Sequence, residues 1–129
     1  MSNQLPPKLA TGTIGELLVQ IHLLQFGVQA APPIKDTGND LIAVRRDVFK
    51  SIQVKTTAGE RYPVGKLPEF YNLLAVVHLV RENSKVFIGE SKVYLIPKES
   101  IDDGTAPRKI SELGNFRMTQ ARIDELFPA

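Results

Sequence analysis

An acid, an amide and a lysine stand at spacings that could gather them into one site. Asp40 follows a turn cluster and opens an apolar segment, and Gln53 and Lys55 lie two residues apart in the next segment. Side chains two apart on a strand share one face, so Gln53 and Lys55 project together while Val54 points into the core. A hairpin between the two segments can bring Asp40 beside them.

Such a cluster suits phosphodiester hydrolysis. A carboxylate can hold a divalent cation near the phosphate, where the cation polarises the phosphoryl oxygen and lowers the pKa of a bound water. A lysine orients the attacking water or neutralises charge on the phosphate. The chain has no cysteine and only two histidines, which disfavours zinc and excludes thiolate sites. Carboxylate and carbonyl oxygens instead favour a hard cation, Mg²⁺ or Mn²⁺.

The apolar pattern predicts the elements that position these residues. Residues 11–27 repeat apolar side chains at helical spacing, with Thr11 or Thr13 as a candidate N-cap and Gly27 as a candidate end. The other expected elements are a turn at 36–39, a hairpin of strands 40–44 and 48–56, a buried strand at 72–80, short strands at 85–88 and 93–96, and a helix at 120–127 capped by Thr119. Both histidines, His22 in the helix and His78 in the buried strand, are interpreted as core or edge residues.

These elements predict an α/β fold with a mixed central β-sheet flanked by helices. The chain has 129 residues, of which 43% are hydrophobic, and this fits one domain over residues 10–129 after a flexible N-terminal arm at 1–9. Residues 57–70 have the length of a parallel crossover, but their prolines and glycines disfavour the usual helix. No segment is apolar enough to span a membrane and none resembles a signal peptide, so we expect a cytoplasmic protein.

The order of these features resembles a known family. Gly15-Glu16 on the helix, Asp40-Leu41-Ile42-Ala43, Gln53-Val54-Lys55 and the apolar strand that follows are similar to the PD-(D/E)XK nuclease superfamily, the restriction-endonuclease-like fold. Archaeal Holliday-junction resolvases and group I intron homing endonucleases of this class are the nearest likenesses. The motif-bearing stretch covers residues 11–56, and residues 71–97 resemble the closing strands of such domains.

The resemblance implies a role for each matching residue. It makes Asp40 a direct metal ligand, Lys55 the motif lysine, and Glu16 the helix-borne glutamate that some members place near the metal. The Val54 carbonyl and Gln53 complete the implied set of ligands for Mg²⁺ or Mn²⁺. Gln53 stands where most members have Asp or Glu, so the site carries less negative charge than usual. Asn39 replaces the weakly kept proline before the aspartate.

Positive charge gathers around the proposed site. The net charge of the whole chain is +2, but residues 45–66 carry a local excess of four positive charges. A basic surface favours a phosphate-backbone partner, although solvated side chains at strand ends give the same pattern. The candidate DNA contacts are Arg45, Arg46, Lys50, Arg61 and Lys66.

Three functions fit these observations. The first is a metal-dependent DNA endonuclease, and the second is a catalytically silent DNA-binding or protein-interaction module on the same fold, which the neutral Gln53 favours. The third is a small structural α/β domain unrelated to nucleic acid. Cutting both strands of a duplex calls for two copies of a single site, so we expect a homodimer or higher homo-oligomer. Candidate contacts are apolar residues of the later elements: Val93, Leu95, Ile123, Leu126 and Phe127. The sequence does not specify the DNA target.

Overall fold

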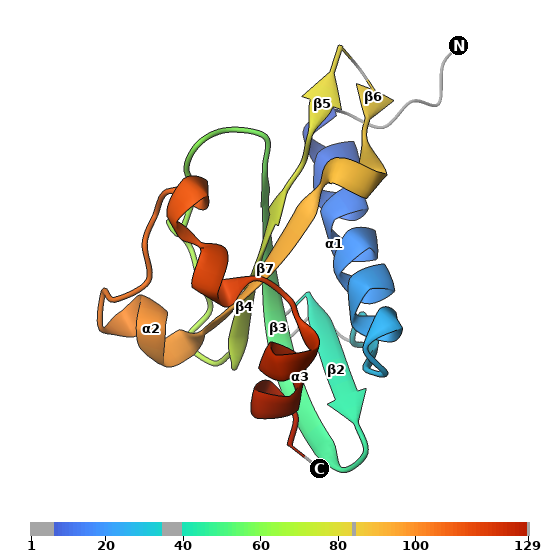
Figure 1. Ribbon diagram of the computed structural model, residues 1–129, viewed down its shortest axis with the longest axis vertical. Coiled ribbons are helices and arrows are strands. Elements are labelled where there is room, and N and C mark those ends of the chain that lie inside the picture. Colours follow the sequence, from blue (N-terminus) through green and yellow to red (C-terminus); the bar gives the residue numbers. More distant parts are fainter. Residues whose placement is uncertain (1–6, 35–39, 84, 129) are drawn as a thin grey trace.

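The structure, a computed structural model that describes residues 7–34, 40–83 and 85–128, is built around one five-stranded sheet (Figure 1). Its strands are β1 (Gln29–Ala31), β2 (Leu41–Arg45), β3 (Val48–Thr57), β4 (Leu73–His78) and β7 (Lys92–Pro97), in the order β1-β2-β3-β4-β7. The pairs β1–β2, β2–β3 and β4–β7 are antiparallel, whereas β3–β4 is parallel. The predicted mixed sheet flanked by helices is therefore confirmed.

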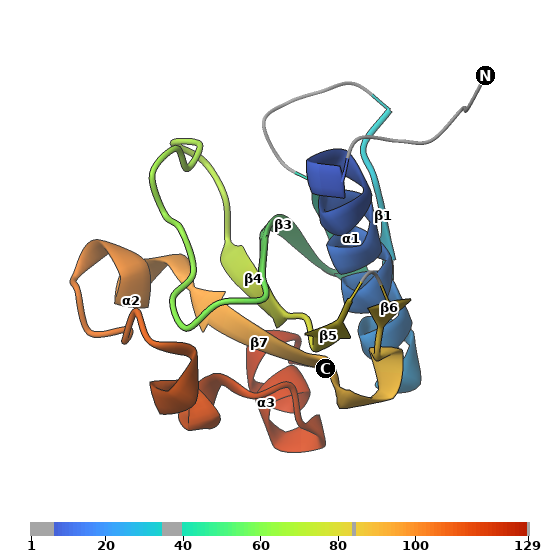
Figure 2. The same cartoon turned by 90° about the horizontal axis from the view of Figure 1, so that it is seen from above.

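The remaining elements are short, apart from the first helix. They are α1 (Pro7–Gln25), the two-stranded β5 (Arg81–Glu82) and β6 (Lys85–Val86), the 3₁₀ turns η1 (Ile88–Glu90), η2 (Ile110–Glu112) and η3 (Gly114–Phe116), and the helices α2 (Lys98–Asp102) and α3 (Gln120–Leu126). Helix α1 lies on one side of β3 and β4, and the β3–β4 crossover and α2 lie on the other (Figure 2). No helix among the described residues is long and apolar enough to cross a membrane.

Helix α1 covers one face of the sheet. Its buried side chains Leu18, Val19 and Leu23 join Ile52 and Val54 of β3 in one apolar cluster. Val28 N–H donates to the Leu23 carbonyl at 3.0 Å and Gly27 N–H to the Leu24 carbonyl at 3.1 Å, with Gly27 at φ 80°. This is the pattern of a glycine that ends a helix in the left-handed region, so the predicted role of Gly27 is confirmed.

The start of α1 was predicted wrongly. The helix begins at Pro7 rather than at residue 11, so Thr11 and Thr13 lie inside it and do not cap it. Proline is favoured in the first helical turn because the N–H that it lacks would have no partner there. Residues 7–9 of the expected arm are therefore helical, and residues 1–6 lie outside the described part of the chain, as does the expected turn at 36–39.

The opposite face of the sheet carries a second apolar cluster. Leu74, Val76, Tyr94 and Ile96 project from β4 and β7 and pack against side chains from outside the sheet, including the fully buried Tyr62. Tyr62 belongs to the crossover between β3 and β4, which contains no helix, in keeping with its Pro63, Gly65 and Pro68. Its hydroxyl donates to the Pro107 carbonyl at 2.6 Å, which fastens the crossover to the C-terminal segment.

The later elements largely follow the predictions. The apolar run 72–80 forms β4, and every residue of Leu73 to Val77 is at most 2% exposed, as expected for a strand covered on both faces. Thr119 caps α3 by accepting a hydrogen bond from Arg122 N–H at 3.2 Å. The predicted strand at 85–88 is shorter, because Ile88 begins the η1 turn.

The residues predicted to form a homo-oligomer contact are wrong for that role. Four of them are at most 1% exposed, namely Val93, Leu95, Ile123 and Phe127, and Leu126 packs against the same cluster. They form the interior of the domain and cannot also face a second copy.

Candidate active site

Asp40 is fixed at the point where β2 meets β3. Its N–H donates to the Ile52 carbonyl at 3.1 Å, and its Oδ2 accepts a hydrogen bond from Val54 N–H at 2.8 Å. Leu41 and Ile52 form the last pair of the antiparallel ladder, and Asp40 directly precedes Leu41. The carboxylate thus occupies the place of the next ladder partner, and this hydrogen bond holds Asp40 against the strand that carries Gln53 and Lys55.

The carbonyl of Val54 faces the same edge as Asp40. Along β3 the Ser51 and Thr57 carbonyls accept from Asn72 and Leu79 N–H groups on the β4 side, whereas the Ile52 carbonyl accepts from Asp40. Backbone groups alternate sides along a strand, and the N–H and C=O of one residue point the same way. Because Val54 N–H donates to Asp40, its carbonyl oxygen also faces that edge.

Gln53 and Lys55 project from the sheet face opposite Val54. They pair with Leu74 and Val76 of the second apolar cluster, whereas Val54 packs in the first. The Gln53 Oε1 atom is buried and has no hydrogen-bond partner within the described ranges 7–34, 40–83 and 85–128. A buried acceptor without a partner costs about 1–3 kcal/mol, so this oxygen is suited to a cation or a water.

Glu16 on α1 lies within electrostatic range of Asp40. Partial burial, and secondarily the negative charge of Asp40, raise the pKa of Glu16 above its ordinary value. The helix glutamate and the strand aspartate are therefore close enough to repel one another. A cation placed between two like-charged carboxylates relieves such repulsion.

These groups fit a hard divalent cation. Glu16, Asp40, Gln53 and the Val54 carbonyl offer oxygen only, which is the donor type of Mg²⁺ and Mn²⁺. Within the part of the chain that the structure describes, no cluster of three or more His, Cys, Asp or Glu side chains could hold a metal ion. A cation site made of these groups would contain two carboxylates and two neutral oxygens, and would therefore carry a low charge.

The five candidate DNA-binding cations lie on different parts of the fold. Lys50 pairs with Ala43 on the α1 face of β3, opposite Gln53 and Lys55. Arg46 occupies the hairpin turn with φ 57°, and Arg61 and Lys66 are exposed on the crossover.

Arg45 is engaged inside the fold. Its Nη1 donates to the Phe127 carbonyl at 2.9 Å and lies 2.9 Å from Asp124 Oδ1. This pair of contacts ties the end of β2 to α3 and gives Arg45 a structural role.

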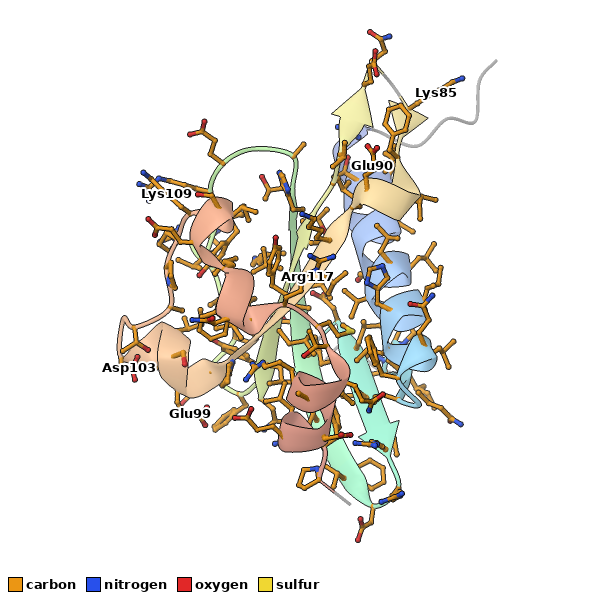
Figure 3. All side chains as sticks on the ribbon, viewed as in Figure 1. Lys85, Glu90, Glu99, Asp103, Lys109 and Arg117 are labelled. Atoms are coloured by element: carbon orange, nitrogen blue, oxygen red, sulfur yellow. The ribbon has the colours of Figure 1, made fainter. Side chains whose placement is uncertain are left out.

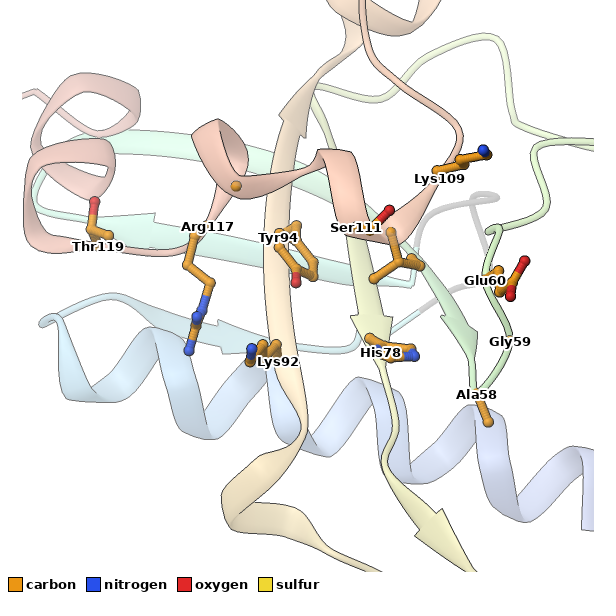
Figure 4. Close-up of a pocket in the computed structure, with 12 residues that line it drawn as sticks. Ala58, Gly59, Glu60, His78, Lys92, Tyr94, Lys109, Ser111, Arg117 and Thr119 are labelled. Carbon is orange, nitrogen blue, oxygen red and sulfur yellow. The ribbon is translucent and has the colours of Figure 1, made fainter.

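Sequence reasoning missed a pocket on the same sheet face as Lys55. It has a volume of about 980 Å³ and is lined by residues from four separate segments (Figure 4): Ala58, Gly59, Glu60, His78, Lys92, Tyr94, Lys109, Ile110, Ser111, Gly114, Arg117 and Thr119. Lys92 and Tyr94 are two residues apart on β7, so their position on one face of a strand could be predicted from the sequence. The other residues of the pocket could not be predicted, because their position beside Lys92 and Tyr94 depends on the order of the strands.

Arg117 also affects the pKa of His22, an ionisable side chain in the second half of α1. Burial, and then the positive charge of Arg117, lower the pKa of His22 below its ordinary value of 6.5. The half-buried position agrees with the interpretation of His22 as an edge residue of the core.

This shift predicts a pH-dependent stability. The unfolded chain binds a proton near pH 6.5 and the folded chain only at lower pH, so the contribution of His22 is present above pH 6.5 and is lost as the pH falls through the folded pKa. Urea unfolding should show that the wild type loses more stability between pH 7.5 and pH 5 than His22→Gln does. An equal loss of stability in both proteins would contradict a lowered pKa of His22 in the folded chain.

Comparison with known proteins supports the fold. No protein-family model and no curated protein sequence matches this chain. Among solved structures, the chain is similar to a bacterial homing endonuclease, I-Ssp6803I, with 16% sequence identity and a TM-score of 0.57. The similarity covers 90% of this chain and 88% of that protein. At this identity the likeness shows the fold, which the two chains share over most of their lengths.

Proposed function

We propose that this protein is a metal-dependent DNA endonuclease of the PD-(D/E)XK type with a Gln-x-Lys variant motif. The observations that support the proposal are the hydrogen bond from Val54 N–H to the Asp40 carboxylate, the electrostatic effect of Asp40 on Glu16, and the placement of Gln53 and Lys55 on one face of β3. The shared fold with a homing endonuclease supports the same reading.

Each side chain has a definable task in phosphodiester hydrolysis. The hydrogen bond from Val54 N–H holds the Asp40 carboxylate in one orientation, and Glu16 adds a second negative charge. A bound Mg²⁺ or Mn²⁺ would supply Lewis acidity at the phosphate and a lowered pKa for water. Lys55, which shares the face of Gln53, orients the attacking water or neutralises the charge that develops on the phosphate.

Asp40→Asn should remove both cation binding and nicking. Asparagine keeps an oxygen that can accept from Val54 N–H but lacks the charge, so the fold should be retained while the site loses one of its two carboxylates. The wild type should bind Mn²⁺ weakly, with Kd on the order of 10⁻⁴–10⁻³ M, and should nick supercoiled plasmid in Mg²⁺ or Mn²⁺ but not in EDTA. Calorimetry and gel analysis of the two proteins test this. Equal Mn²⁺ binding or equal nicking by both would contradict the assignment of Asp40.

A catalytically silent DNA-binding module is the second candidate. Gln53 favours it, because a neutral amide stands where a nuclease of this type usually has a carboxylate. Such a protein would retain salt-dependent DNA binding and would leave the plasmid supercoiled at every cation concentration. The same nicking experiment therefore separates the two functions.

Self-association of this chain is part of the proposal, on a different surface from the one expected. The apolar side chains Leu17, Ile21 and Leu24 follow one another on the outer side of α1 and are 51%, 49% and 59% exposed. Three large apolar side chains in one stripe on a helix suit contact with the same stripe of a second copy.

Ile21→Glu should therefore produce monomers. Light scattering of the wild type at tens of micromolar should give at least twice the chain mass of 14.3 kDa, and the variant should give 14.3 kDa. Phe70→Glu serves as a control because Phe70 is 77% exposed and lies outside the stripe. A monomeric wild type would refute self-association and would favour a nickase that cuts one strand at a time.

A further inference from the structure

The pocket beside the candidate active site has walls that are fixed by backbone contacts. On one side, residues Arg61 and Lys109 form a β-bridge and Ile110 N–H donates to the Glu60 carbonyl at 2.8 Å. On the other side, Tyr94 and Arg117 form a second bridge. Tyr94, only 6% exposed, contributes to its floor. The pocket is therefore a preformed feature of the fold rather than a gap between loose segments.

The lining is rich in positive charge. The lining contains the cations Lys92, Lys109 and Arg117 and one carboxylate, that of Glu60. None of the three cations forms an ion pair with any carboxylate in the segments that the structure describes. Cations that surround a pocket and lack acidic partners attract an anionic ligand.

The positions of these cations favour an extended anion. Arg117 and Lys92 lie toward one end of the pocket and Lys109 toward the other, and the two views that label Lys109 and Arg117 both separate them (Figures 3 and 4). Both ends of the pocket therefore carry positive charge. A chain of phosphates could contact both.

The sheet register connects the pocket to Lys55. Lys55 pairs with Val76 and Val76 with Tyr94, so the three side chains form one row across the same face. The next row consists of Thr57, His78 and Lys92. The pocket therefore extends from the row of Lys55, which contains Tyr94, over the next row, which contains His78 and Lys92.

We propose that this pocket binds consecutive phosphates of a nucleic-acid strand that continues from Lys55, with Lys92 and Arg117 contacting one part of the strand and Lys109 another. The proposal rests on nucleic acid being the partner, as in the proposed function, but does not require that the strand be cut. The hydroxyls of Ser111 and Thr119 are further hydrogen-bond donors in the same lining.

The test measures binding of a short fluorescent single-stranded oligodeoxynucleotide in EDTA, where no cleavage can occur. Lys92→Gln and Arg117→Gln are compared with Lys85→Gln, which removes the same charge from an exposed position on β6, away from the pocket (Figure 3). Each pocket variant should weaken binding about threefold and make the dependence of log affinity on log salt shallower by about 0.7, the contribution of one phosphate contact on a single strand. Lys85→Gln should match the wild type.

Nuclear magnetic resonance adds a readout at the pocket itself. The chain has only two histidines, so the ring signals of His78 can be assigned with a His22→Gln variant. They should shift when the oligodeoxynucleotide is added. Unchanged His78 signals, equal affinities for the pocket variants and Lys85→Gln, or equally tight binding of an oligo-glutamate would each overturn the proposal. Absence of nicking together with intact pocket binding would refute only the catalytic function.

Discussion

Lys55→Ala is expected to lower the rate of plasmid nicking by about a hundredfold or more while leaving the melting temperature nearly unchanged. Removing one group that stabilises charge in the transition state costs on the order of 10²–10³ in rate. Lys55 lies on the face of β3 that bears Gln53, away from the α1 core, and its side chain forms no hydrogen bond or ion pair with another described residue. Its loss should therefore remove chemistry rather than packing.

Lys50→Ala is the matched control for this experiment. Lys50 is a lysine of the same strand, also half-buried, but it pairs with Ala43 on the opposite face. Rates from plasmid nicking and melting curves should show Lys50→Ala close to the wild type in both. A Lys55→Ala protein that nicks normally but melts much earlier would show that Lys55 is structural.

Gly15→Ala is expected to destabilise the fold by about 2 kcal/mol or more. A Cβ atom at this position would collide with Thr56 Oγ1 and would lie only 2.9 Å from Thr56 Cβ and 3.0 Å from its Cγ2. Threonine is branched at Cβ, so it cannot swing the whole obstruction aside, and overpacking of this kind typically costs about 1–3 kcal/mol. Gly15 precedes Glu16, so a displaced α1 would also move that carboxylate away from Asp40.

Gly12→Ala is the control, because a Cβ there would meet nothing within 4 Å. Alanine is favoured over glycine inside a helix by about 0.5–1 kcal/mol, so this variant should be slightly more stable than the wild type. Urea unfolding of both variants measures the difference. If Gly15→Ala proved as stable as Gly12→Ala, the close approach of α1 to β3 at Thr56 would be refuted.

The elements were predictable where local sequence decides them. The unbroken apolar run at 72–80 has few alternatives to a strand buried on both faces, and the 45–47 connection leaves little choice but a hairpin. The start of α1 is not where the sequence predicts it, because prolines near residue 7 favour an irregular arm as well as a first helical turn.

The site was predictable only in part, because local sequence determines some of its contacts and not others. Hairpin pairing and alternation on β3 determine how Asp40, Gln53 and Lys55 lie, and both are local properties. Alternation also places Lys50 on the opposite face, which the sequence could have shown. The ion pair of Arg45 with Asp124 and the pocket beside Lys55 depend on contacts between segments far apart in the chain, which no local pattern encodes.

Anomalous diffraction from crystals soaked in Mn²⁺ tests the central claim most directly, since the claim is that Glu16, Asp40, Gln53 and the Val54 carbonyl form a cation site. We expect a Mn²⁺ peak within bonding distance of the Asp40 carboxylate and the Val54 carbonyl oxygen, with Gln53 Oε1 turned toward it, and no such peak in Asp40→Asn. A wild-type crystal in millimolar Mn²⁺ with no peak beside Asp40 would contradict the account.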